Sequence, residues 1–146
     1  MTYVVESTDR INKSWWTLKI ALGVGPILAG LDKYFNLLTD WKMYLNPLAT
    51  KIVPVSPETF MHVVGLVEIL AGVLVLSRWT KIGGYVVMAW LLAIAASLVS
   101  MGMFYDLAVR DIEIAVGAFV LAELSAARET QPVVISAGTA TGHLAV

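Results

Sequence analysis

Apolar residues fall in four long blocks along this chain, at 14–38, 58–77, 81–105 and 107–127. A helix needs about 20 mainly apolar residues to cross a hydrocarbon core of roughly 30 Å. All four blocks meet that length, and the second and third lack the alternating polar face of a soluble helix. The pattern predicts an all-α protein, an integral membrane four-helix bundle. A soluble helical bundle is the alternative that this pattern disfavours.

The four blocks differ in the charges that they contain. No charged residue occurs from 82 to 105, and Glu68 is the only one in the second block after residue 58. The first block ends in a charged pair, Asp32 and Lys33. The fourth block is the least apolar, because it contains Arg110, Asp111, Glu113 and Glu123.

The segments outside the blocks complete the predicted organisation. Residues 39–57 contain prolines that interrupt regular helical hydrogen bonding. We therefore expect an interfacial or partly re-entrant loop between the first and second helices. A polar N-terminal segment at 1–13 and a polar C-terminal tail at 128–146 would flank the membrane domain at 14–127.

The distribution of Lys and Arg predicts the orientation, because cytoplasmic loops carry an excess of these residues. Six would lie on the side of the two termini and four on the opposite side. We therefore expect a multi-pass protein of a bacterial inner membrane with both termini in the cytoplasm. The first group is Arg10, Lys13, Lys19, Arg78, Lys81 and Arg128, and the second is Lys33, Lys42, Lys51 and Arg110.

Composition agrees with a membrane location. Hydrophobic residues make up 58% of the 146 residues and charged residues 14%, whereas soluble domains average about 45–50% and 25%. The mean hydropathy is +0.77. A water-soluble fold of this size could not bury so much apolar surface.

Charge and motif content exclude several classes of function. The formal net charge is −1 and no run of Lys or Arg occurs, which argues against nucleic-acid binding. The chain has no Cys, so disulfides, thiol nucleophiles and thiolate metal sites are excluded. It also lacks the glycine-rich nucleotide, zinc-protease, serine-hydrolase and EF-hand motifs. We therefore assign no catalytic residue and no metal site.

Glu68 is the sharpest candidate for function, because an ionisable group inside a membrane is costly. Helical spacing places Gly65, Glu68 and Gly72 within an arc of about 60°, so this face is expected to point into the bundle. Glu68 could carry a proton or contact a quinone or another ligand. It could equally join two helices as a buried glutamic acid.

His62 lies one to two turns inside the start of the same helix, about 120° around it from Glu68. It is a candidate ligand for haem or chlorophyll, or a hydrogen-bond partner for a quinone oxygen. The alternative is an interfacial histidine that only makes hydrogen bonds.

A group of charges at the predicted outer side forms a second candidate. Arg110 and Glu113 share a helical face, and Asp111 points about 100° away. Asp32 and Lys33 end the first helix on the same side. These residues could form one buried network that fixes how the helix ends meet. They could also line a polar cavity open to the outer face.

Three stretches resemble the DoxX-like family of membrane proteins. They are the run 65–76 followed by a basic turn, the stretch 29–35, and the stretch 110–118. The resemblance covers roughly residues 15–127 and implies a four-helix membrane protein. It also implies that Glu68, Asp32, Lys33 and Arg110 are ligand or network positions. The family takes its name from a small subunit of a thiosulfate:quinone oxidoreductase, and other members are associated with redox enzymes.

The interpretation we favour is a small accessory or scaffold subunit of a larger respiratory or photosynthetic electron-transfer complex. Its partners would be membrane lipids and other membrane subunits, and it would help to shape a site for quinone, lipid or pigment at a subunit interface. One alternative is a quinone-linked oxidoreductase component of the thiosulfate:quinone type. Another is a small membrane transporter or lipid-binding protein.

Overall fold

The computed structural model describes residues 2–130, with side chains from residue 9 onward. Within this range all regular structure is helical, as predicted, and no strand occurs. There are four long helices, α1 (Thr2–Phe35), α3 (Pro57–Leu76), α4 (Thr80–Ser100) and α5 (Tyr105–Glu129). Two short helices, the 3-10 helix η1 (Trp41–Tyr44) and α2 (Pro47–Ile52), lie between α1 and α3.

Two helices, α1 and α4, end several residues earlier than predicted, for reasons of backbone conformation. Helix α1 ends at Phe35 rather than at 38, because Asn36 adopts a left-handed conformation with φ of 52°. Helix α4 ends at Ser100 rather than at 105, because Gly102 and Phe104 have φ of 70° and 59°. Residues in the left-handed conformation commonly end a helix, because the backbone leaves the helical path there.

The ends of the chain were predicted to be separate polar segments. The described part of 1–13 instead continues α1, which begins at Thr2. Most of the predicted tail, 131–146, lies outside the described residues.

The loop predicted at 39–57 contains more regular structure than its prolines suggested. Pro47 and Pro57 occupy the first turns of α2 and α3 instead of interrupting a helix. Proline is tolerated there because the N–H groups of the first turn have no partner within the helix. The side chains of Asn46 and Ser56 cap the same two helices by accepting hydrogen bonds from backbone N–H groups.

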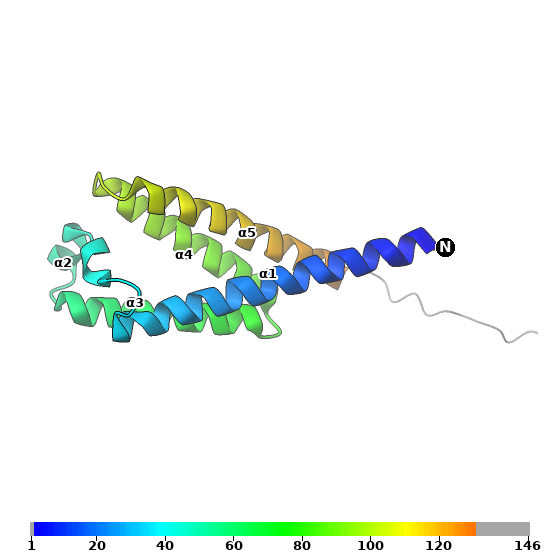
Figure 1. Ribbon diagram of the computed structural model, residues 1–146, viewed down its shortest axis with the longest axis horizontal. Coiled ribbons are helices and arrows are strands. Elements are labelled where there is room, and N and C mark those ends of the chain that lie inside the picture. The colour runs from blue at the N-terminus through cyan, green and yellow to red at the C-terminus, as the bar shows by residue number, and fades with distance from the viewer. Residues whose placement is uncertain (1, 131–146) are drawn as a thin grey trace, which may run out of the picture.

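The four long helices form two pairs, α1 with α3 and α4 with α5. Figure 1 shows the pairs close together at the end that holds the α3–α4 turn and apart at the other end, where η1 and α2 lie. At the closed end, one cluster of buried apolar residues draws on all four helices. Its members are Trp15, Leu22, Ala71, Val75, Val87, Ala118 and Leu121.

Glycines bring α1 and α3 into backbone contact at two levels. Gly23 lies against Gly72, and Gly30 lies against Gly65, so the two helices run antiparallel. A Cβ atom added at Gly30 would lie 2.5 Å from the carbonyl oxygen of Gly65, which leaves no space for any other residue. The prediction that the face of Gly65 and Gly72 points into the bundle is confirmed.

The outer surface of the bundle is apolar. Large hydrophobic side chains are exposed on all four long helices, among them Leu28, Leu70, Ile82 and Val116. Among the described residues, three segments are long and apolar enough to cross a membrane, and α5 is not one of them. They are Asp9–Phe35, Pro57–Leu76 and Thr80–Ser100. The fold is therefore compatible with a membrane helical bundle.

Candidate functional site

A buried ion pair joins α1 to α3. The Lys33 ammonium donates to the Glu68 carboxylate at 2.6 Å, and the two side chains are only 5% and 9% exposed. Lys33 reaches Glu68 because its Cβ leaves α1 beside Gly65, one turn before Glu68 in α3. Two opposite charges in this setting compensate each other, whereas either one alone would be costly to bury.

Helix η1 closes over this ion pair. The Lys33 ammonium lies 3.7 Å from the centre of the Trp41 ring, which is a cation–π contact. The indole N–H of Trp41 donates to the Asp32 carboxylate at 2.7 Å. Asp32 also accepts from the backbone N–H groups of Leu37 and Leu38. Asp32 therefore fixes both the end of α1 and the position of the tryptophan.

The second helix pair contributes Trp90 from α4 and Asp111 from α5. The indole nitrogen of Trp90 lies beside the Glu68 carboxylate, but it is buried and makes no hydrogen bond of normal geometry within the described residues. Asp111 is 4% exposed and lies within electrostatic reach of Glu68. The partly exposed Arg110 guanidinium donates to Asp111 at 3.0 Å.

We refer to this group of six residues as the polar cluster. It comprises Asp32, Lys33, Trp41, Glu68, Trp90 and Asp111. With the neighbouring Arg110 it carries two positive and three negative formal charges. It offers a ligand two kinds of contact: the ammonium and indole N–H donors, and the carboxylate acceptors.

The structure brings together four of the residues that sequence predicted, Asp32, Lys33, Glu68 and Asp111. Arg110 lies at the edge and bends back to its neighbour Asp111 rather than to Glu113. Glu113, which could have shared a network with Arg110, is exposed and makes no ion pair among the side chains described, 9–130.

His62 lies outside the polar cluster. Its ring stacks on that of Tyr34 with 4.7 Å between the centres. The Tyr34 hydroxyl donates to the His62 backbone carbonyl at 2.8 Å. His62 therefore helps to hold α1 against α3 at this level. In the described part of the chain, no group of three His, Cys, Asp or Glu side chains is placed to hold a metal ion.

Sequence reasoning missed the two tryptophans of the cluster. Neither Trp41 nor Trp90 was predicted from the sequence to be a site residue. A signal for Trp90 was present, because its indole N–H needs an acceptor and it lies in the middle of a block without any charge. Glu68 on the neighbouring helix was the available acceptor.

Comparisons of this chain with protein-family models, with curated proteins and with solved structures gave no match. The resemblance to the DoxX-like family therefore stays a prediction.

Proposed function

We propose that this protein is a DoxX-like accessory subunit of an electron-transfer complex in a bacterial inner membrane, and that its polar cluster forms one wall of a quinone site. The observation that carries the proposal is the buried indole N–H of Trp90, which lies beside the Glu68 carboxylate of the Lys33–Glu68 ion pair but makes no hydrogen bond of normal geometry within the described residues. Buried donors without a well-formed hydrogen bond are rare in proteins, and a ligand with an acceptor oxygen would complete this one.

A quinone head group fits the donors of the polar cluster. Its carbonyl oxygens accept hydrogen bonds, and its flat ring suits a setting that contains the indole rings of Trp41 and Trp90. When a quinone is reduced, its oxygens take up protons. Glu68, whose carboxylate lies beside the Trp90 indole, would take part in that transfer.

The proposed membrane location includes a fourth crossing by α5. Its buried face is built mainly of small residues, such as Ala108, Ala115 and Ala118, whereas Ile112, Val116 and Phe119 are exposed. A helix with small residues inside and large apolar residues outside is suited to lipid rather than to water. The charge of Glu123 is also partnered, because the Tyr85 hydroxyl of α4 donates to it.

The number of crossings can be measured directly, because the chain has no Cys. Single cysteines are introduced by Lys51→Cys, Arg78→Cys, Met103→Cys and Thr130→Cys, and intact cells are treated with a membrane-impermeant maleimide. With four crossings and cytoplasmic termini, Lys51→Cys and Met103→Cys are labelled from outside, and Arg78→Cys and Thr130→Cys only after lysis. Labelling of Thr130→Cys in intact cells together with Met103→Cys would show that α5 does not cross.

Removing the N–H group of Trp90 is expected to weaken quinone binding about tenfold, the value of one hydrogen bond. Trp90→Phe keeps an aromatic ring at this position. Trp79→Phe is the matched control, because Trp79 is exposed at the opposite end of the bundle. The dissociation constant of a short-chain benzoquinone is measured by calorimetry on protein in detergent. Equal affinity for the wild type and Trp90→Phe would rule out the proposed contact.

The accessory role is tested separately by purifying the native protein in mild detergent. We expect redox subunits to co-purify, identified by mass spectrometry, with an absorption spectrum that shows their flavin, haem or chlorophyll. A colourless sample that contains only this chain would contradict the accessory role. It would favour transport or lipid binding instead.

A further inference from the structure

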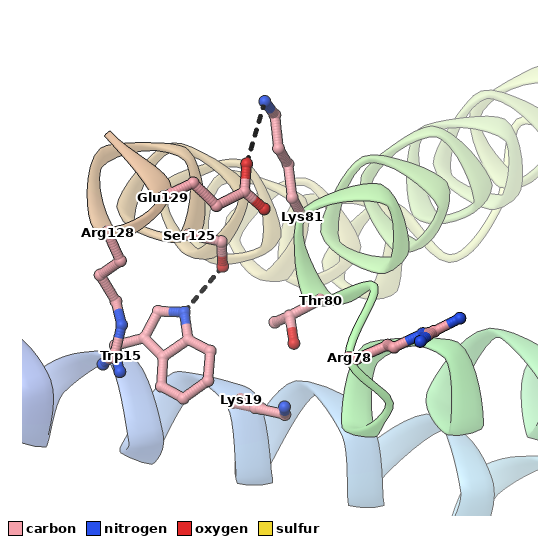
Figure 2. A pocket seen from close by; sticks show the side chains of 8 residues that line it. All are labelled: Trp15, Lys19, Arg78, Thr80, Lys81, Ser125, Arg128 and Glu129. Atoms are coloured by element: carbon pink, nitrogen blue, oxygen red, sulfur yellow. Dashed lines mark hydrogen bonds and ion pairs between the residues drawn. The ribbon is translucent and has the colours of Figure 1, made fainter. Parts of the chain in front are cut away.

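A second polar region lies at the closed end of the bundle, away from the polar cluster. It is a cavity of about 250 Å³, lined by α1, α5 and the α3–α4 turn with the start of α4. Figure 2 shows Trp15 reaching from α1 toward Ser125, Lys19 beside Trp15 on α1, and Arg128 approaching Trp15 from α5. These elements meet here because both termini of the bundle and the α3–α4 turn lie at one end (Figure 1).

The charges around the cavity are unbalanced. Four cations line it, Lys19, Arg78, Lys81 and Arg128, but Glu129 is the only acidic residue among the described residues of the lining. Glu129 lies 3.7 Å from the Lys81 ammonium, so its charge is already matched. None of the ion pairs among the described residues includes the other three cations. The sequence from 131 to 146 contains no Asp or Glu that could supply the missing charge.

Two of these cations contact the same aromatic ring. The Lys19 ammonium lies 4.8 Å and the Arg128 guanidinium 4.0 Å from the centre of the Trp15 ring. Lys19 is 7% exposed, and its one hydrogen bond goes to the Ser77 carbonyl oxygen at 2.9 Å. Two like charges near one ring repel each other, and an anion that binds both of them would relieve that repulsion.

A buried donor also points to a missing ligand. The Nη1 atom of Arg128 is inaccessible to solvent and has no hydrogen-bond partner among the residues whose side chains are described, 9–130. The indole N–H of Trp15 is not available to a ligand, because it already donates to the Ser125 hydroxyl at 2.7 Å. The Ser125 hydroxyl in turn donates to the Leu121 carbonyl oxygen, so the guanidinium and the ammonium are left for a ligand.

The level of the cavity relative to the proposed membrane narrows the choice of anion that it could bind. The exposed side chains of Trp16 and Trp79 lie next to it in sequence, and tryptophan is enriched at the head-group level of a membrane. Basic pockets between membrane helices on the cytoplasmic side are suited to lipid phosphates. A phosphate group also offers several acceptor oxygens to donors that approach from different helices.

We propose that this cavity binds a phosphate group through Lys19 and Arg128, with Arg78 at its mouth. The phosphate belongs either to the head group of an anionic phospholipid in the inner leaflet or to a soluble phosphate compound. This site is independent of the polar cluster, so its test does not depend on the quinone proposal.

Two binding measurements at low ionic strength distinguish the sources. In the first, inorganic phosphate is titrated into the protein in neutral detergent and followed by calorimetry. In the second, the protein is placed in nanodiscs of phosphatidylcholine with or without phosphatidylglycerol, and the retained lipid is counted by native mass spectrometry. Retention of phosphatidylglycerol without phosphate binding assigns a lipid head group. Phosphate binding alone assigns a soluble compound, and binding in both assays assigns the shared phosphate chemistry.

Arg128→Gln is expected to reduce binding at least tenfold in whichever assay is positive, because a charge-assisted hydrogen bond is lost. Lys42→Gln is the matched control, since it removes one cation from the opposite end of the bundle, and we expect no change. If Arg128→Gln does not fold, Arg128→Lys keeps the charge and should bind with intermediate affinity. Absence of binding in both assays, or equal losses for Arg128→Gln and Lys42→Gln, would overturn the proposal.

Discussion

Lys33→Met and Glu68→Leu are each expected to lower the free energy of unfolding by about 3–5 kcal/mol, because each leaves one charge buried without its partner. The combined variant, Lys33→Met with Glu68→Leu, is expected to recover most of that loss. Both charges are then replaced by apolar side chains of similar size, which is often neutral or stabilising at buried ion pairs. The measurement is reversible unfolding of the purified protein in detergent, followed by circular dichroism.

An exposed ion pair at the same end of the bundle provides the control. Lys42 lies 3.9 Å from Asp40, and both side chains are about half exposed. Lys42→Met should therefore change the free energy of unfolding by less than about 1 kcal/mol. If the double variant is as unstable as the two single variants together, the Lys33–Glu68 contact does not hold α1 against α3.

The double variant also separates the two roles that the sequence left open for Glu68. A purely structural ion pair predicts a double variant that is stable and binds quinone normally. The proposed function predicts a double variant that is stable but binds quinone weakly, because the Lys33 donor and the Glu68 carboxyl group are gone. The quinone affinity of the double variant therefore decides whether Glu68 has a purely structural role or also contributes to quinone binding.

The sequence predicted the face of α3 that points inward, but not the residue that it meets. Gly65, Glu68 and Gly72 share a face by helical spacing alone, and the structure buries all three. To predict that Glu68 pairs with Lys33, one must also know the register between α1 and α3. That register is set by the backbone contacts of Gly23 with Gly72 and of Gly30 with Gly65. Equal spacing of the two glycine pairs along their helices was the signal that could have given it.

Other contacts depend on how the chain folds over longer distances. Trp41 reaches Lys33 only because η1 folds back over the end of α1, and helical periodicity carries no information about such a loop. Lys19 was included among the cytoplasmic-side cations, but its burial against Trp15 depends on the approach of α5. The packing of helix pairs, rather than local pattern, creates both polar regions of the molecule.

Gly30→Ala is expected to lower the free energy of unfolding by about 1–3 kcal/mol, the usual cost of inserting a methyl group into a packed interface. The new Cβ atom would lie 2.5 Å from the Gly65 carbonyl oxygen and 2.9 Å from Ile69 Cγ1. The first of these neighbours is backbone, so α1 and α3 must move apart. Unfolding in detergent measures the loss.

Gly25→Ala is the matched control on the same helix, because a Cβ atom there meets nothing within 4 Å. We expect this variant to be as stable as the wild type or slightly more so, since alanine favours a helix more than glycine does. Equal effects of the two substitutions would show that the Gly30–Gly65 contact does not set the helix spacing.

The consequence of Gly30→Ala should reach the polar cluster. Lys33 lies less than one turn beyond Gly30, so separation of the helices lengthens the distance from its ammonium to the Glu68 carboxylate. Gly30→Ala and Glu68→Leu should therefore be less than additive in their effects on unfolding, because the first substitution already weakens the ion pair that the second removes. Additive effects would mean that the glycine contact and the ion pair stabilise the α1–α3 interface independently.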